Sequence, residues 1–124
     1  MKKIIHTENA PKAIGPYSQA IEVNGMLFIS GQIPVAPETG QIPETIELQT
    51  EQVMKNIGAI LEEAGYGYEH VVKSTCLLSD MVNFKAMNEV YGKYYVNNPP
   101  TRAAFAVKEL PLKVLIEIET IAVK

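Results

Sequence analysis

One arginine and two glutamates near the C-terminus are the residues whose type and setting could do chemistry. Arg102 follows the proline pair Pro99-Pro100, and Glu117 and Glu119 interrupt an otherwise aliphatic run. A charge set among Val, Leu and Ile side chains needs a partner or a function, because burying it alone is very costly. We therefore expect Arg102 to hold an anionic substrate and Glu117 to handle a proton or a water molecule.

Arg102 has the chemistry of a carboxylate-binding residue. Its planar guanidinium can hold a carboxylate through two parallel hydrogen bonds, which lysine cannot reproduce. The prolines before it restrict the backbone, and a positioned side chain loses less freedom on binding. The alternative is a structural ion pair with Glu117 or Glu119, which the spacing alone leaves equally open.

Glu117 lies in a segment, residues 114–122, that reads as a strand with side chains alternating between two faces. One face is predicted to join the core and carries Val114, Ile116, Ile118, Thr120 and Ala122. The other face places Glu117 and Glu119 between Leu115 and Ile121. This mixed face is either an exposed surface with two acids or the lining of an interface or pocket.

Length and composition predict one domain that spans residues 1–124. A chain of 124 residues buries roughly two thirds of its unfolded surface, which is enough for a core. The formal net charge of -3, with acids and bases interspersed, argues weakly against nucleic-acid binding. The sequence has no apolar run of the ~18 residues that a membrane span needs. Its N-terminal apolar run is too short for a signal peptide, so we expect a cytoplasmic protein without membrane contact.

The remaining pattern predicts the elements that position these residues. Asn24-Gly25 joins two apolar runs and is typical of a hairpin, and Thr45 and Gly65 bound a segment with helical periodicity. Strands are expected at residues 2–6, 19–23, 26–30, 71–78, 102–108 and 114–123, with one helix at residues 45–64 and another that starts at Asp80 or Asn83. The apolar stripe of that second helix carries Phe84, Met87, Tyr91 and Tyr94, with Asn88 on or beside it.

Two helices cannot cover both faces of a six-stranded sheet. They are expected to pack on one face and to leave apolar side chains on the other, which then needs a cover. We therefore expect a homo-oligomer in which sheet faces meet.

No motif of a nucleophilic, metal or phosphate site occurs: GxSxG, HExxH, CxxC and GxxxxGK[ST] are all absent. Cys76 lies in an apolar strand and is expected to pack rather than react. His6 and His70 are interpreted as surface or edge residues. We expect neither a metal nor an organic cofactor.

Four spaced segments resemble the reactive-intermediate deaminase family (Rid, formerly YjgF), and its RidA branch in particular. They are Ile14-Gly15-Pro16-Tyr17-Ser18-Gln19, Ser30-Gly31-Gln32-Ile33-Pro34, Pro100-Thr101-Arg102 and Ile116-Glu117-Ile118-Glu119. The resemblance covers essentially the whole chain. It implies an α+β fold similar to chorismate mutase, with a six-stranded mixed sheet and two helices packed on one face. It also implies a homotrimer with sites in the clefts between subunits.

The resemblance implies hydrolysis of enamine or imine acids, such as 2-aminoacrylate and 2-iminobutanoate, to 2-keto acids and ammonia. Such a 2-iminobutanoate/2-iminopropanoate deaminase acts on products of pyridoxal-phosphate enzymes such as serine/threonine dehydratase. Arg102 matches the carboxylate-binding arginine, and Glu117 matches the acid that positions or activates water. The pocket-lining positions, expected from the neighbouring subunit relative to Arg102, are Tyr17, Ser30, Gly31 and Asn88.

The sequence departs from the family pattern at two places. Many relatives carry a cysteine two residues after the arginine, where this chain has Ala104. Thiol chemistry cannot operate there, although the backbone of Ala104 can still contact substrate or water. The connection before Pro100 also looks a few residues shorter than in enteric-bacterial members, which bears on substrate size.

Two alternatives belong to other functional classes. One is a binding or regulatory protein that senses a small keto or amino acid with the same arginine and has no turnover. The other is an endoribonuclease, an activity reported for some family members. The acidic balance of the chain argues against the second.

Overall fold

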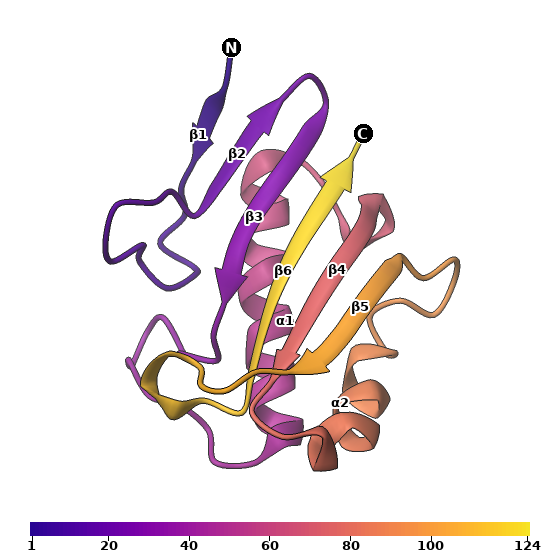
Figure 1. Ribbon diagram of the computed structural model, residues 1–124. Helices are drawn as coiled ribbons and strands as arrows, with labels where there is room; N and C mark the ends of the chain where they lie inside the picture. Colours follow the sequence, from indigo (N-terminus) through magenta and orange to yellow (C-terminus); the bar gives the residue numbers. More distant parts are fainter.

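Six strands and two helices form the chain in the computed structural model, which describes residues 1–124 (Figure 1). The strands are β1 (Lys3–Ile5), β2 (Ala20–Val23), β3 (Met26–Gln32), β4 (Val71–Leu78), β5 (Thr101–Ala106) and β6 (Ile116–Val123). The helices are α1 (Ile46–Ala64) and α2 (Phe84–Tyr91). Three short 3₁₀ turns, which were not predicted, are η1 (Tyr68–His70), η2 (Met81–Asn83) and η3 (Pro111–Lys113).

The strands form one mixed sheet in the order β1-β2-β3-β6-β4-β5. All neighbours run antiparallel except β4 and β5, which are parallel. Both helices lie behind this sheet in Figure 1 and leave its front face open. The predicted α+β architecture, with two helices on one face of a six-stranded sheet, is confirmed.

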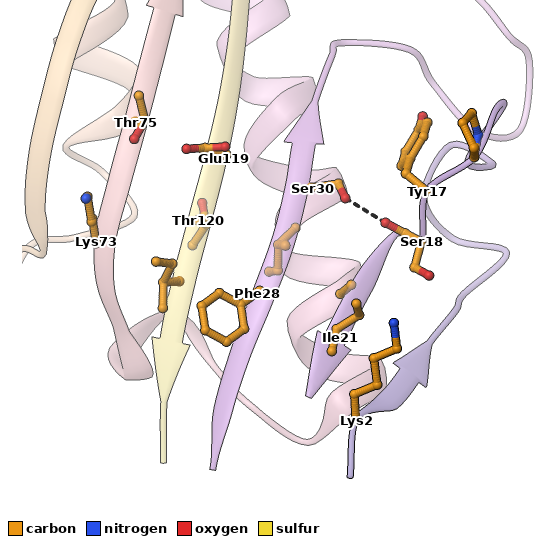
Figure 2. Close-up of a pocket in the computed structure, with 14 residues that line it drawn as sticks. Lys2, Tyr17, Ser18, Ile21, Phe28, Ser30, Lys73, Thr75, Glu119 and Thr120 are labelled. Carbon is orange, nitrogen blue, oxygen red and sulfur yellow. Dashed lines mark hydrogen bonds between the residues drawn. The ribbon is translucent and has the colours of Figure 1, made fainter. Parts of the chain in front are cut away.

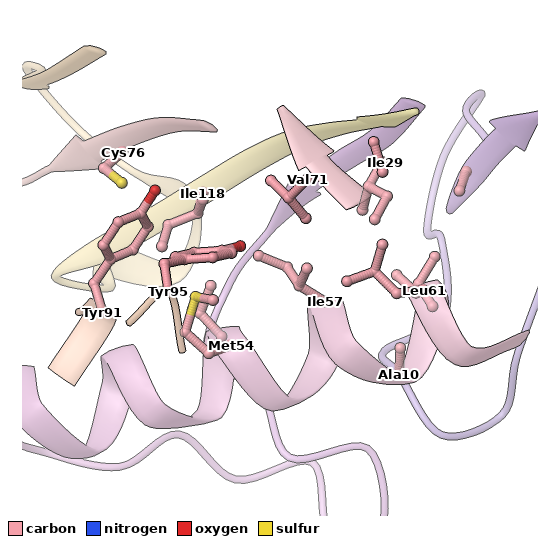
Figure 3. Packing of buried hydrophobic residues seen from close by; sticks show 14 of the residues in the cluster. Ala10, Ile29, Met54, Ile57, Leu61, Val71, Cys76, Tyr91, Tyr95 and Ile118 are labelled. Atoms are coloured by element: carbon pink, nitrogen blue, oxygen red, sulfur yellow. The ribbon is translucent and has the colours of Figure 1, made fainter. Parts of the chain in front are cut away.

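Helix α1 begins and ends where the sequence predicts. The Thr45 hydroxyl accepts a hydrogen bond from the backbone N–H of Leu48 at 3.2 Å, which satisfies one free donor of the first turn. Gly65 ends the helix with φ of 81°, a left-handed conformation that costs glycine little. Its apolar stripe packs on the sheet, and Figure 3 shows Ile57 and Leu61 of α1 beside Ile29, Val71 and Ile118 of three strands.

Strand β6 is central, and its side chains alternate as predicted. The first face is buried and includes Ile116, Ile118, Thr120 and Ala122. On the other face, Glu117 and Ile121 are half-buried and Glu119 is exposed. The acids therefore lie on the face of the sheet that no helix covers.

Several predicted boundaries move by a few residues. Strand β3 was expected to end at Ser30 but continues to Gln32, because a register shift between Ile29 and Gln32 lets the strand resume pairing with β6. Helix α2 stops at Tyr91, so Tyr94 lies beyond it rather than on its stripe. The backbone after Tyr91 forms hydrogen bonds between residues three apart instead of four. Tyr94 packs on Tyr68 with ring centroids 5.2 Å apart.

The open face carries a row of apolar side chains across several strands. Ile4 pairs with Ile21, Ile21 pairs with Phe28, and Phe28 pairs with Ile121. Phe28 is 39% exposed and Ile4 is 53% exposed. An apolar row of this kind is typical of a surface that another protein chain covers. It supports the expected homo-oligomer, which stays a prediction.

Cys76 is fully buried in β4, as predicted for a packing residue. Burial raises the pKa of its thiol to about 11, and the nearby Arg102 charge offsets only part of this shift. Neither helix is long and apolar enough to cross a membrane.

Candidate functional site

Arg102 lies on edge strand β5, on the side of the sheet that the helices cover. Its partner in the parallel ladder is Ser74, which is fully buried on that side. Paired residues of neighbouring strands share a face, so the arginine points toward α2. Its Nη1 donates a hydrogen bond to Oδ1 of Asn88 at 2.6 Å, and its Cζ lies 5.1 Å from the ring centre of Tyr91.

No carboxylate contacts the guanidinium of Arg102. The only ion pair in the chain joins His6 and Glu8 at 3.4 Å. The alternative of a structural ion pair between Arg102 and Glu117 or Glu119 is therefore wrong within one chain. Neutral groups hold this cation, which leaves its charge free for an anion. A cleft of about 470 Å³ lies beside it and is lined by Asn88, Tyr91, Gly92, Tyr95, Pro99, Pro100 and Arg102.

Glu117 lies on the opposite, open face of the sheet. It pairs with Leu77 of β4. Leu77 lies between the buried residues Cys76 and Leu78, so it points to the opposite face of the sheet. Its side chain lies directly against Gly31 of β3 and accepts no hydrogen bond within the chain. Burial raises the pKa of Glu117 above its ordinary value, and the neighbouring Glu119 carboxylate adds to the rise. A half-buried carboxylate without donors is poised to accept a proton.

Tyr17 and Ser30 lie on the same side of the molecule as Glu117. Both residues and Glu119 line a pocket of about 510 Å³ on the open face, and Figure 2 shows their side chains around it. The Ser30 hydroxyl donates to the carbonyl of Ser18 at 2.6 Å, which joins β3 to the loop that carries Tyr17. The tyrosine itself is 51% exposed. Tyr17 and Gly31 also border a larger, mostly apolar cleft of about 660 Å³.

The predicted site residues therefore fall into two half-sites. The arginine half holds Arg102 and Asn88, and the carboxylate half holds Glu117 with Tyr17, Ser30 and Gly31. None of the clefts described above contains residues of both halves. The two halves lie on opposite faces of one sheet, so a single chain does not bring them together.

The expectation that Asn88 comes from the neighbouring subunit relative to Arg102 is wrong. Its side chain accepts a hydrogen bond from Arg102 of the same chain. The reason is local, because α2 packs beside β5 and places Asn88 under the edge strand. Tyr17, Ser30 and Gly31 do lie apart from Arg102, as a site between subunits requires.

Ala104 shares the helix-facing side of β5 with Arg102, since it pairs with the buried Cys76. Its methyl group packs against the core, and the residue is half-buried. Strand β5 has only one neighbour in the sheet, so one edge of its backbone is free to contact a ligand or a partner chain. The contact of Ala104 with substrate stays a prediction.

Phe84 and Tyr91 were not predicted to contact Arg102. The periodicity of α2 placed both on its inward stripe with Asn88 on or beside it. This shared position was the signal in the sequence for their contact with one partner. It could not show that this stripe meets β5 rather than the middle of the sheet. No three His, Cys, Asp or Glu side chains gather where they could hold a metal ion.

Comparison with known proteins identifies the family. The family model described as Endoribonuclease L-PSP matches residues 7–124. The chain belongs to the Rid (YjgF) family. Among its Rid relatives, a RutC family protein of Pyrococcus horikoshii is 56% identical over 125 residues, which cover 100% of this chain and 99% of that protein.

Two further Rid relatives have informative names. Reactive Intermediate Deaminase A of Arabidopsis thaliana, a chloroplastic protein, is 49% identical over 98% of this chain and 65% of its own length. The crystal structure of TdcF from E. coli, determined with bound serine, matches with a TM-score of 0.96 and 42% identity, and 98% of each chain is covered. The shared Rid fold confirms the architecture that the sequence predicted.

Proposed function

We propose that this Rid protein hydrolyses small 2-imino acids and their enamine forms, such as 2-iminobutanoate and 2-aminoacrylate, to 2-keto acids and ammonia. The observation that carries this proposal is the guanidinium of Arg102, which is held by neutral groups and has no carboxylate partner. Such a cation can bind the carboxylate that every substrate of this class carries.

The chemistry requires little beyond placement and one base. Arg102 holds the substrate carboxylate while a water oxygen forms a bond to the protonated imine carbon. The electron pair of the C=N bond moves to nitrogen, and Glu117 takes the proton that the water loses. Return of this proton to nitrogen allows ammonia to leave as the C=O bond forms, and the hydroxyl proton then passes to Glu117 and on to solvent. A positioned carboxylate base contributes about 10²–10⁴-fold to such a step.

Two copies of the chain are needed to complete this site, because its halves lie on opposite faces of the sheet. In the proposed assembly, Tyr17, Gly31 and Glu117 of one subunit face Arg102 of the next. A closed ring of such head-to-tail contacts is a trimer in the family that the sequence resembles. The apolar row on the open face, from Ile4 to Ile121, supports an assembly that covers it.

The names of relatives support the same reaction class and one alternative. One relative is a Reactive Intermediate Deaminase A, and the TdcF structure holds serine, an amino acid with a free carboxylate. Bound serine also favours a second candidate function, a sensor of small amino or keto acids without turnover. An endoribonuclease role, as in the description of the family model, has less support because the chain carries a net charge of -3.

A coupled assay tests the proposal. A threonine dehydratase generates the imine in the presence of semicarbazide, which traps it, and the wild-type protein should suppress semicarbazone formation. Arg102→Ala and Arg102→Lys should lose most of this effect, because lysine cannot form the paired hydrogen bonds. Lys55→Ala, which removes an exposed charge from α1, is the matched control and should keep full activity.

Two outcomes would reject the proposal. A wild-type protein that never changes the semicarbazone yield, yet binds 2-ketobutyrate tightly, would be a sensor. Near-native turnover by Arg102→Lys would remove Arg102 from its proposed role.

A further inference from the structure

Three side chains of one helical face surround the guanidinium of Arg102. Phe84, Asn88 and Tyr91 follow one another at intervals of four and three residues along α2, so they lie on one side of the helix. The Cζ of Arg102 is 5.4 Å from the ring centre of Phe84 and 5.1 Å from that of Tyr91. Asn88 accepts its hydrogen bond from Nη1.

These distances are those of cation–π contacts, which are favourable within about 6 Å of a ring centre. Two rings and one amide oxygen restrain a single side chain that is otherwise exposed. An unrestrained arginine loses rotamer entropy when a ligand fixes its side chain. Phe84, Asn88 and Tyr91 therefore restrict the Arg102 side chain before a ligand binds, which reduces the entropy lost on binding.

Tyr91 can serve this purpose because its own ring is packed in the core. It is only 6% exposed, and its ring packs on that of Tyr95 with centroids 4.9 Å apart. Figure 3 shows both rings in the core beside Cys76 and Met54. The hydroxyl of Tyr91 is buried and has no hydrogen-bond partner. The ring, and not the hydroxyl, therefore makes the contact with Arg102.

We propose that Phe84 and Tyr91 are positioning residues that fix the guanidinium of Arg102 for a bound carboxylate. Asn88 accepts from Nη1, and the two rings contact the cation without a hydrogen bond, which leaves the other N–H groups for the ligand. The inference rests on the proposed function only in that Arg102 binds the substrate carboxylate. It assigns to α2 a part in ligand affinity that is separate from its part in the core.

Binding of 2-ketobutyrate, measured by calorimetry, tests the inference without any need for turnover. Phe84→Leu and Tyr91→Leu keep an apolar side chain but remove the ring. Each should weaken binding by about 3- to 10-fold, the range of one cation–π contact. Tyr91→Phe restores the ring and should bind like the wild type. In the imine assay the leucine variants should show a raised KM with kcat close to that of the wild type.

Val90→Ala is the control for stability, because Val90 is 5% exposed on the same helix and does not contact Arg102. It should lower the melting temperature and leave the Kd of 2-ketobutyrate unchanged. In an Arg102→Ala background, Tyr91→Leu should cause no additional loss of binding, since its effect passes through the arginine.

Unchanged affinity in both leucine variants, or equal losses with and without Arg102, would overturn the inference. Failure of the proposed function looks different: the wild type would bind 2-ketobutyrate through Arg102 and show the ring dependence, yet would not accelerate imine loss. A wild type whose 2-ketobutyrate binding is absent or independent of Arg102 would overturn both.

Discussion

Gly31 lies so close to the carboxylate of Glu117 that a Cβ at position 31 would overlap Oε2. Residue 31 sits in the irregular stretch between Ile29 and Gln32, where β3 changes register against β6. Glycine is needed here for the close approach of a side chain and not for a left-handed backbone, since its φ is not positive. The position of the proposed base thus depends on the absence of one methyl group.

Gly31→Ala should therefore reduce activity far more than stability. The carboxylate is the free end of a flexible side chain, so it can move aside without unfolding the sheet. A displacement of about 1 Å can cost ~10²-fold in rate, while the free energy of unfolding should fall by less than about 1 kcal/mol. Imine hydrolysis and thermal melting of the same sample check both parts. A variant that retains native kcat would show that Glu117 need not occupy its observed position.

Glu117→Gln should abolish most activity and yet raise stability at neutral pH. Loss of the base should cost about 10²–10⁴-fold in kcat. The stability gain arises because burial, with help from Glu119, holds the folded-state pKa of Glu117 above its unfolded value. The folded protein binds this proton more strongly, so its stability falls as pH rises from the ordinary glutamate range through the raised pKa. The melting temperature of the variant should exceed that of the wild type at neutral pH. The difference should disappear in acid.

Glu119→Gln should move the acidic limb of the activity profile to lower pH. The Glu119 charge is the second cause, after burial, of the raised Glu117 pKa. Its removal should let the base ionise at lower pH, and the effect should be smaller than that of burial because water screens this exposed neighbour. The pH dependence of kcat/KM reports the ionisation in the free protein. An acidic limb that stays in place would exclude Glu117 as the titrating group.

Mixing two inactive variants should restore activity if each site draws on two chains. Arg102→Ala supplies an intact carboxylate half, and Glu117→Ala supplies an intact arginine half. Co-refolding at equal amounts should produce about one quarter of intact sites in a head-to-tail ring. Co-refolded samples of each variant alone are the controls and should stay inactive. Absence of recovery in verified mixed assemblies would contradict the two-chain site.

Gly58→Ala in α1 should destabilise the protein, although alanine usually improves a helix by about 0.5–1 kcal/mol. A Cβ at position 58 would overlap the hydroxyl of Tyr68, which donates to the carbonyl of Met54 at 2.7 Å. Overpacking of this kind costs about 1–3 kcal/mol. Chemical denaturation measures the change. In a Tyr68→Leu background the same substitution should cost much less, and an equal cost there would refute the steric cause.

The fold was predictable because its signals are local. Periodicity defined α1, Thr45 and Gly65 bounded it, and Asn24-Gly25 marked the hairpin. The alternation along β6 placed Glu117 on the mixed face. Boundaries near Gln32 and Tyr94 were missed because pairing with β6 and packing on Tyr68 decide them, and both partners are distant in sequence.

The sequence indicated candidate residues, whose shared role in a site stays a prediction, but not their arrangement. The motifs indicated Arg102 and Glu117, and the stripe of the second helix indicated Asn88. Which face Arg102 takes, however, depends on the parallel register of β5 against β4. Sequence spacing does not contain that register. Because this register was unknown, the contact of Asn88 with Arg102 was not predicted, and Asn88 was assigned to the wrong subunit.

Cys76 of β4 is fully buried, and burial raises the pKa of its thiol to about 11, so its reactivity can report on opening of the fold. Disulfide reagents react with thiolates, so Cys76 of the folded chain should not react with them. The reagent can reach the sulfur only when β4 separates from the helices. The rate of labelling at this single position therefore counts how often the interior of each subunit becomes accessible, without an added probe.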